Sequence, residues 1–243
     1  MRTGPTQVMV VAGDDEARRE IVRALSSGSL ACREAASGAQ CLRDVKDRRP
    51  DLVILDLYLP DQSGIGVCRL LRETSETARI PIIMVSAQAS EIDRVVAFES
   101  GADDFVARPF YPAELRARVD AVVRGFSAPP PRERGASLER GPVRVDARSG
   151  RAMVEGERIE LTAREFALLL ELVSQSGRVV RRRQLIEQVW GDRAPPTDRA
   201  IDAHVKSIRR KLGSARDCIE TVRGVGYRFV TDPVTDPGIG SGE

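Results

Sequence analysis

The chain has little of what a metal centre, a disulfide framework or a membrane anchor needs. It has a single histidine, which excludes a histidine-rich metal centre. The four cysteines are scattered, without a C-x-x-C pair, so we interpret them as reduced structural thiols. No apolar run reaches the length of a membrane span, and the first residues do not form a secretory signal. We therefore expect a soluble, cytoplasmic protein that has no membrane partner.

Length and charge distribution favour two domains with different partners. A chain of 243 residues has room for two domains. Counting Lys and Arg against Asp and Glu gives a net charge of −2 for residues 1–124 and +4 for the rest. This asymmetry indicates a polyanionic partner for the second half. The expected divisions are a first domain at 7–124, a Pro-, Gly- and Arg-rich linker at 125–139, a second domain at 140–232 and a disordered tail at 233–243.

The first domain alternates short apolar runs with segments of helical spacing. Strands are expected at 8–12, 30–35, 51–59, 80–85 and 102–107. Helices are expected at 17–25, 37–45, 67–71, 92–98 and 115–123. This alternation predicts an α/β fold with a doubly wound, five-stranded parallel sheet and right-handed crossovers.

Polar residues stand where several of these strands end. Asp56 closes an apolar run, Asp14 and Asp15 follow the first strand, and Ser86 and Arg108 follow the last two. A lone aspartate there would more commonly cap a turn. The carboxyl ends of parallel strands converge, however, so the three acids could hold Mg²⁺ through oxygen ligands. A hydroxyl and a cation beside them could then hold a phosphoryl group on Asp56.

With these motifs in their order and spacing, residues 8–124 resemble a response-regulator receiver domain. The matching segments are 14–16, 55–64, 85–87 and 101–110. The resemblance implies that Asp56 accepts phosphate from a histidine kinase, with Mg²⁺ on Asp14, Asp15 and Asp56, and with Ser86 and Arg108 on the phosphoryl oxygens. It also implies a homodimer through the last two helices and the last strand. The charged residues there are Arg94, Asp103, Asp104, Glu114, Arg116 and Arg118.

The pocket departs from the family pattern. The family has two adjacent acids after the first strand. Aligning the first helix places Gly13 and Asp14 there, whereas aligning the strand places Ala12 and Gly13, so at least one acid is missing in either register. Arg108 replaces the usual lysine, and Phe105 replaces an aromatic residue that often carries a hydroxyl. A receiver that works without phosphorylation is therefore an alternative.

An aspartyl-phosphate phosphatase is a second alternative. Such enzymes need an acid two residues after the nucleophile, and Tyr58 occupies that position. We therefore expect no enzymatic activity.

The second half predicts a winged helix-turn-helix. Alternating residues at 143–146 and 151–161 indicate short antiparallel strands. Thr162 and Glu165 form a capping box at the start of a helix. Further helices are expected at 182–190 and 199–212, and a hairpin at 219–230.

Residues 141–231 resemble OmpR/PhoB-type effector domains through segments 161–169, 189–191, 199–212 and 221–229. The resemblance implies that the third helix enters the major groove of DNA as a recognition helix. The implied DNA-binding residues are Arg182, Trp190, Arg199, His204, Lys206, Ser207, Arg210, Thr221 and Arg223. Trp190 would be half core and half backbone contact, and His204 could instead be an ordinary helix histidine. The loop 192–197 would contact RNA polymerase. The expected function is a transcription regulator that dimerises on tandem half-sites.

Overall fold

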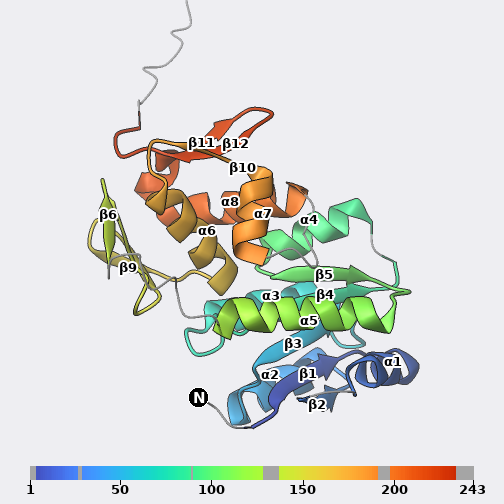
Figure 1. The fold of residues 1–243 in the computed structure, drawn as a ribbon. Helices are drawn as coiled ribbons and strands as arrows, with labels where there is room; N and C mark the ends of the chain where they lie inside the picture. Colours follow the sequence, from blue (N-terminus) through green and yellow to red (C-terminus); the bar gives the residue numbers. More distant parts are fainter. Residues whose placement is uncertain (1–3, 27–28, 89, 128–136, 191–197, 234–243) are drawn as a thin grey trace, which may run out of the picture.

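The computed structural model describes residues 4–26, 29–88, 90–127, 137–190 and 198–233. Figure 1 shows two lobes: residues 4–127, blue to green, lie below residues 137–233, which run from yellow to red. After the resemblances described above, they are called the receiver lobe and the effector lobe. In the described part of the chain, no helix is long and apolar enough to span a bilayer.

The receiver lobe is built on a five-stranded parallel sheet. Its strands are β1 (Thr6–Val11), β2 (Leu30–Ala35), β3 (Leu52–Asp56), β4 (Ile82–Ser86) and β5 (Asp104–Ala107). They lie in the order β2-β1-β3-β4-β5, and each neighbouring pair is parallel. This confirms the doubly wound sheet that the sequence predicts.

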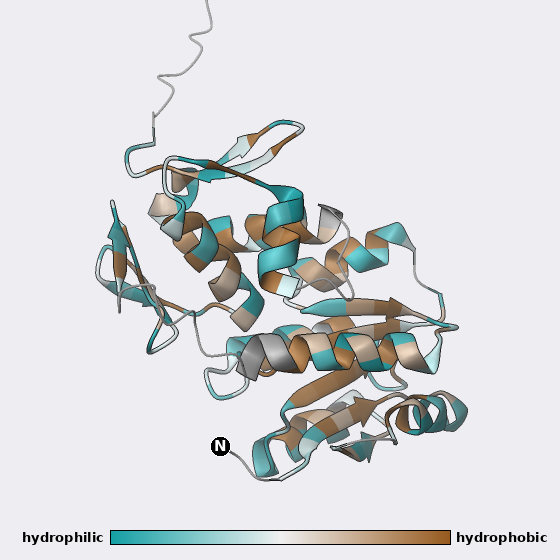
Figure 2. Cartoon of the chain, in the orientation of Figure 1, coloured by the Kyte–Doolittle hydropathy of each residue, from teal (hydrophilic) through white to brown (hydrophobic). Residues whose placement is uncertain are grey.

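Five helices cover the two faces of that sheet. They are α1 (Asp15–Leu25), α2 (Gly38–Asp47), α3 (Gly64–Glu73), α4 (Glu91–Glu99) and α5 (Pro112–Ser127). Alternate residues of β1 and β3 pack with α1 and α5 on one face and with α2 and α3 on the other. Because both faces are covered, the central strands are apolar along their length, as Figure 2 shows.

The effector lobe begins with an antiparallel sheet of β6 (Leu138–Arg140), β7 (Val143–Asp146), β8 (Arg151–Val154) and β9 (Glu157–Ile159). Three helices follow: α6 (Ala163–Ser174), α7 (Arg182–Trp190) and α8 (Asp198–Leu212). A short 3-10 helix, η1 (Gly213–Cys218), joins α8 to the wing hairpin β11 (Ile219–Val222) and β12 (Gly226–Phe229). The strand β10 (Val179–Arg181) adds a third strand beside β12. Sequence reasoning missed β6 and β10, because three residues are too few to show alternation.

The two lobes meet where α8 packs against α4, with α7 beside α5 (Figure 1). Ala200 and Ala203 of α8 belong to the same buried apolar cluster as Ala97 and Phe98 of α4. Regular structure also enters both ends of the segment expected to be a linker, because α5 continues to Ser127 and β6 begins at Leu138.

Candidate phosphoacceptor pocket and DNA-binding surface

Asp56 is the last residue of β3 and lies at the carboxyl edge of the sheet. Its side chain is largely buried, with 8% of the residue exposed. Burial raises the pKa of Asp56; hydrogen bonds from backbone N–H groups and the charge of Arg108 oppose this rise, and the charge of Asp14 adds to it. Asp56 Oδ1 accepts from Tyr58 N at 3.2 Å. The carboxylate is thus held at a strand end between one acid and one cation.

The loop after Asp56 returns very close to the strand. Gly64 N donates to Leu57 O at 2.8 Å, at the start of α3. A Cβ on Gly64 would lie 2.0 Å from the carbonyl oxygen of Asp56. Glycine is therefore required at position 64 because the backbone of Asp56 leaves no room for a side chain, and not because of an unusual φ angle.

Among the acids after β1, Asp14 contributes negative charge to the surroundings of Asp56. Asp14 is the N-cap of α1, and its Oδ2 accepts from Ala17 N at 2.8 Å. Asp15 is exposed and forms an ion pair with Arg18. Within the described ranges, no group of three Asp, Glu, His or Cys side chains is placed to hold a metal ion. The three-carboxylate site expected from Asp14, Asp15 and Asp56 is therefore not gathered here, although receiver domains generally bind Mg²⁺ at this edge.

Gly13 explains why an acid is missing from the pocket. A Cβ at this position would lie 2.7 Å from Cδ of Pro60, in the loop after β3. Real Cβ atoms essentially never come so close to another heavy atom, so Pro60 would have to move to admit an acidic side chain. With glycine at position 13, Asp14 is the acid after β1 that acts on Asp56.

The two residues expected to hold phosphoryl oxygens lie on neighbouring strands. Ser86 ends β4, is fully buried, and accepts from Gln88 N at 3.2 Å. Arg108 follows β5, and its Nη2 donates to Glu20 Oε2 at 2.9 Å. Its Nε is buried and has no hydrogen-bond partner among the described residues. A buried guanidinium N–H beside a carboxylate could donate to an anionic oxygen.

A first group of the expected DNA-binding residues is open to solvent. Arg210, Thr221 and Arg223 are exposed, and they line a groove of about 1240 Å³ between α8, η1 and the wing. Its basic side chains, apart from the expected Arg210, Arg223 and Lys206, are Arg209, Arg216 and Arg228. Arg216 and Arg228 were missed by sequence reasoning, because they lie outside the recognition helix and become neighbours only when the wing folds back on it.

The second group is covered. His204 is fully buried and Ser207 is 3% exposed, with its Oγ donating to Glu165 Oε1 at 2.6 Å. Trp190 is 4% exposed, and its indole N–H donates to the carbonyl oxygen of Asp103 in the receiver at 3.3 Å. These three side chains are not available to DNA in this arrangement.

Two further basic residues expected to bind DNA form ion pairs within the chain, and the side chain of a third is not described by the structure. Lys206 Nζ lies 2.7 Å from Glu99 Oε1 of α4. Arg182 Nε donates to Asp202 Oδ1 at 2.9 Å, and its guanidinium lies over the ring of Tyr227. The side chain of Arg199 and the loop 192–197 lie outside the described residues.

The charged residues expected at a dimer interface bond within the chain. Arg118 Nη1 lies 3.1 Å from Asp104 Oδ1, and Arg118 Nη2 lies 3.2 Å from Glu114 Oε1. Arg94 lies over the ring of Phe105. The remaining two residues also lie within the receiver: Arg116 Nη2 donates to Ala24 O, and Asp103 is fully buried.

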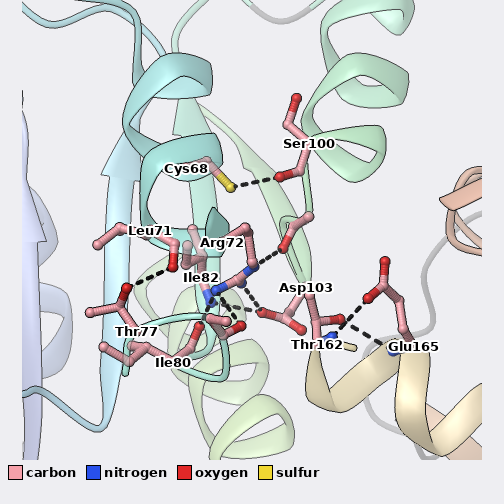
Figure 3. Close-up of polar contacts among 12 residues, drawn as sticks. Cys68, Leu71, Arg72, Thr77, Ile80, Ile82, Ser100, Asp103, Thr162 and Glu165 are labelled. Carbon is pink, nitrogen blue, oxygen red and sulfur yellow. Dashed lines mark hydrogen bonds and ion pairs between the residues drawn. The ribbon is translucent and has the colours of Figure 1, made fainter. Parts of the chain in front are cut away.

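Asp103 belongs to a buried network under the contact between the lobes. Arg72 Nη2 lies 2.9 Å from Asp103 Oδ2, and the same guanidinium donates to the carbonyl oxygens of Ala78, Ile80 and Gly101. Burial raises the pKa of Asp103, and the charge of Arg72 opposes that rise. Figure 3 shows this network beside Thr162 and Glu165 at the start of α6. Arg72 thus connects α3 to the segments that lead into β4 and β5, beneath the receiver surface that faces the effector lobe.

A parallel sheet with an aspartate at a strand end, joined to a winged helix-turn-helix with a basic groove, defines a two-domain response regulator. Comparison with known proteins agrees. Residues 8–120 match the family "Response regulator receiver domain", and residues 156–229 match "Transcriptional regulatory protein, C terminal".

The phosphate regulon transcriptional regulatory protein PhoB of Pseudomonas aeruginosa is 38% identical over 221 residues, which cover 90% of this chain and 95% of that protein. The DNA-binding response regulator MtrA of Mycolicibacterium smegmatis is 38% identical over 231 residues, 94% of this chain and 98% of that protein. A solved structure of a RitR mutant shares the fold, with a TM-score of 0.75 at 22% identity over 93% of this chain and 100% of that chain. The chain belongs to the OmpR/PhoB family of DNA-binding response regulators.

Proposed function

We propose that this protein is a transcription regulator whose receiver controls whether α8 can enter the major groove of DNA. The observation that carries the proposal is the packing of α8 on α4, which buries His204 and engages Lys206 with Glu99. The groove between α8 and the wing stays open and basic. In this closed arrangement, with α8 packed on α4, the chain can therefore contact DNA phosphates, but it cannot place the covered face of α8 in the major groove.

The proposed signal is phosphorylation of Asp56 by a histidine kinase. Ser86 and the unpartnered Nε of Arg108 would donate to the phosphoryl oxygens, and Asp14 and Asp56 are the acids that remain to hold Mg²⁺. Bound Mg²⁺ would neutralise charge on the incoming phosphate. Phosphorylation would release α8 and expose the face formed by α4, β5 and α5, which we propose then pairs two receivers on tandem half-sites. RNA polymerase is the further partner proposed.

The test combines phosphorylation with DNA binding. Wild type and Asp56→Ala are treated with acetyl phosphate and Mg²⁺, and each is assayed by Phos-tag electrophoresis, sedimentation and affinity for duplex DNA. The proposal expects a retarded band, dimerisation and tighter DNA binding in wild type only. Absence of the retarded band from wild type would remove Asp56 as the switch.

The alternative is a receiver that regulates the same output without phosphorylation. The observations that favour it are the lack of room for a side chain at Gly13 beside Pro60 and the pairing of Asp15 with Arg18, which leave the pocket one acid short. Under this alternative, Asp56→Ala binds DNA as tightly as wild type does, and acetyl phosphate changes neither protein.

A further inference from the structure

The single histidine of the chain lies inside the contact between the lobes. The His204 ring centroid lies 5.5 Å from that of Phe98 of α4 and 5.4 Å from that of Trp190 of α7. The residue is fully buried, and neither Nδ1 nor Nε2 has a hydrogen-bond partner within the described structure. An imidazole held this way has no acceptor for a second proton and no water to solvate its charge.

The charged groups that act on His204 come from α3, α6 and α8. Glu165 favours the protonated ring, whereas three cations disfavour it: Arg164 of α6, Lys211 of α8 and Arg72 of α3. Glu99 of α4 is already paired with Lys206. The surroundings therefore offer the imidazolium little compensation for its burial.

We propose that protonation of His204 releases α8 from the receiver, so that acidification favours the open chain with an accessible recognition helix. This inference rests on the proposed function, because it concerns the regulation of the same helix. The physical reason is that the charged ring is tolerated only where water can reach it, and water reaches it only when α8 separates from α4.

The direction and size of the effect follow from linkage. Burial, with the cations named above, lowers the pKa of His204 from 6.5 to about 4 in the closed chain. In the open chain the exposed ring returns to an ordinary value near 6.5. The closed state is therefore fully favoured above pH 6.5, and its population falls as the pH decreases from 6.5 toward 4. At about pH 5.5 the ratio of open to closed molecules rises about tenfold relative to neutral pH.

The first test reads the histidine directly in the full chain. Because there is one histidine, its imidazole protons give one set of resonances in a pH titration. Wild type is expected to titrate well below pH 6.5. The matched variant is Ala203→Gln, which places a long uncharged side chain on the α8 face that packs on α4, and its titration should move up toward 6.5. A wild-type pKa near 6.5, or an unchanged value in Ala203→Gln, would overturn the inference.

The second test reads the opening itself. Trp190 is the single tryptophan, so its emission reports exposure of the contact. Wild type should shift to the red as the pH falls from 6.5 toward 4, while His204→Phe and His204→Asn, which do not titrate there, should not. An equal shift in both variants would assign the effect to other groups, such as the buried Asp103 and Asp104.

Binding to a mixed-sequence DNA duplex at constant salt separates the two proposals. Tighter binding at about pH 5.5 than at pH 7.5 in wild type, lost in His204→Phe, supports the proton-linked opening. Duplex binding that shows no pH difference between wild type and His204→Phe contradicts the inference but leaves the regulator intact. No duplex binding at any pH contradicts the proposed function itself.

Discussion

Lys206 of the recognition helix forms an ion pair with Glu99 of α4, with Nζ and Oε1 separated by 2.7 Å. The two residues are 107 positions apart in the sequence and belong to different lobes. The Lys206 side chain is 73% exposed and that of Glu99 is 31% exposed, so the pair sits at the rim of the contact. A cation that we propose to face DNA is thus paired with an acid of the receiver in the closed arrangement.

Replacing Glu99 by Gln should loosen this contact and strengthen DNA binding. Exposed ion pairs contribute about 0.2–1 kcal/mol, so the affinity for duplex DNA should rise about 1.5- to fivefold. The matched control is Glu16→Gln, which removes the same charge from an exposed position on α1, far from α8 in Figure 1. Gel-shift titrations of the three proteins at one salt concentration would measure the effect. Equal gains in both variants would mean that net charge, and not the pair, controls affinity.

Replacing Arg72 by Ala should strongly destabilise the receiver. Its guanidinium bonds to Asp103 and to three carbonyl oxygens, and removing it leaves a fully buried carboxylate unpaired. Breaking a buried pair in this way costs about 3–5 kcal/mol of unfolding free energy. Arg69→Ala, an exposed arginine on the same helix, should cost less than about 1 kcal/mol. Urea denaturation of the full chain would separate the two, and similar losses would contradict the importance of the network.

The two acids after β1 should differ in their effect on phosphorylation. Asp14 acts on Asp56 electrostatically, whereas Asp15 is paired with Arg18. Asp14→Asn should therefore lower labelling by acetyl phosphate in the presence of Mg²⁺, while Asp15→Asn should leave it unchanged. Asparagine keeps the N-cap of α1, so the helix is preserved in the first variant. Phos-tag electrophoresis would give the labelled fraction, and loss of labelling in Asp15→Asn instead would show that Asp15 enters the pocket.

Arg210 should contribute to DNA binding even in the closed arrangement, because it is exposed and lines the open groove. If Arg210 contacts a phosphate, Arg210→Ala should weaken binding to all duplexes and lower the slope of log affinity against log salt by about one. Arg43→Ala removes the same charge from an exposed position on α2 and should leave the slope unchanged. Affinities measured across a salt series would decide, and an unaltered slope in Arg210→Ala would place this side chain away from the phosphates.

Much of this architecture follows from local patterns. The alternation of apolar runs and helical spacing determined the five-stranded sheet, and Asp56 was placed at its edge because the run it closes is a buried strand. The capping box of Thr162 and Glu165 determined where α6 begins, and the structure contains both of its hydrogen bonds. These features depend on neighbours within a few residues, so the sequence alone carries them.

Only the tertiary structure decided which face of α8 is free. The apolar stripe of Ile201, Val205, Ile208 and Leu212 is visible in the sequence, and it is buried in the effector core. The face beside this stripe, with Ala203 and His204, is small or weakly polar, so it has no hydrophobic period to mark it, yet α4 packs on it and it is buried as well. Its burial depends on how two surfaces distant in the sequence fit together, and no local pattern encodes that fit.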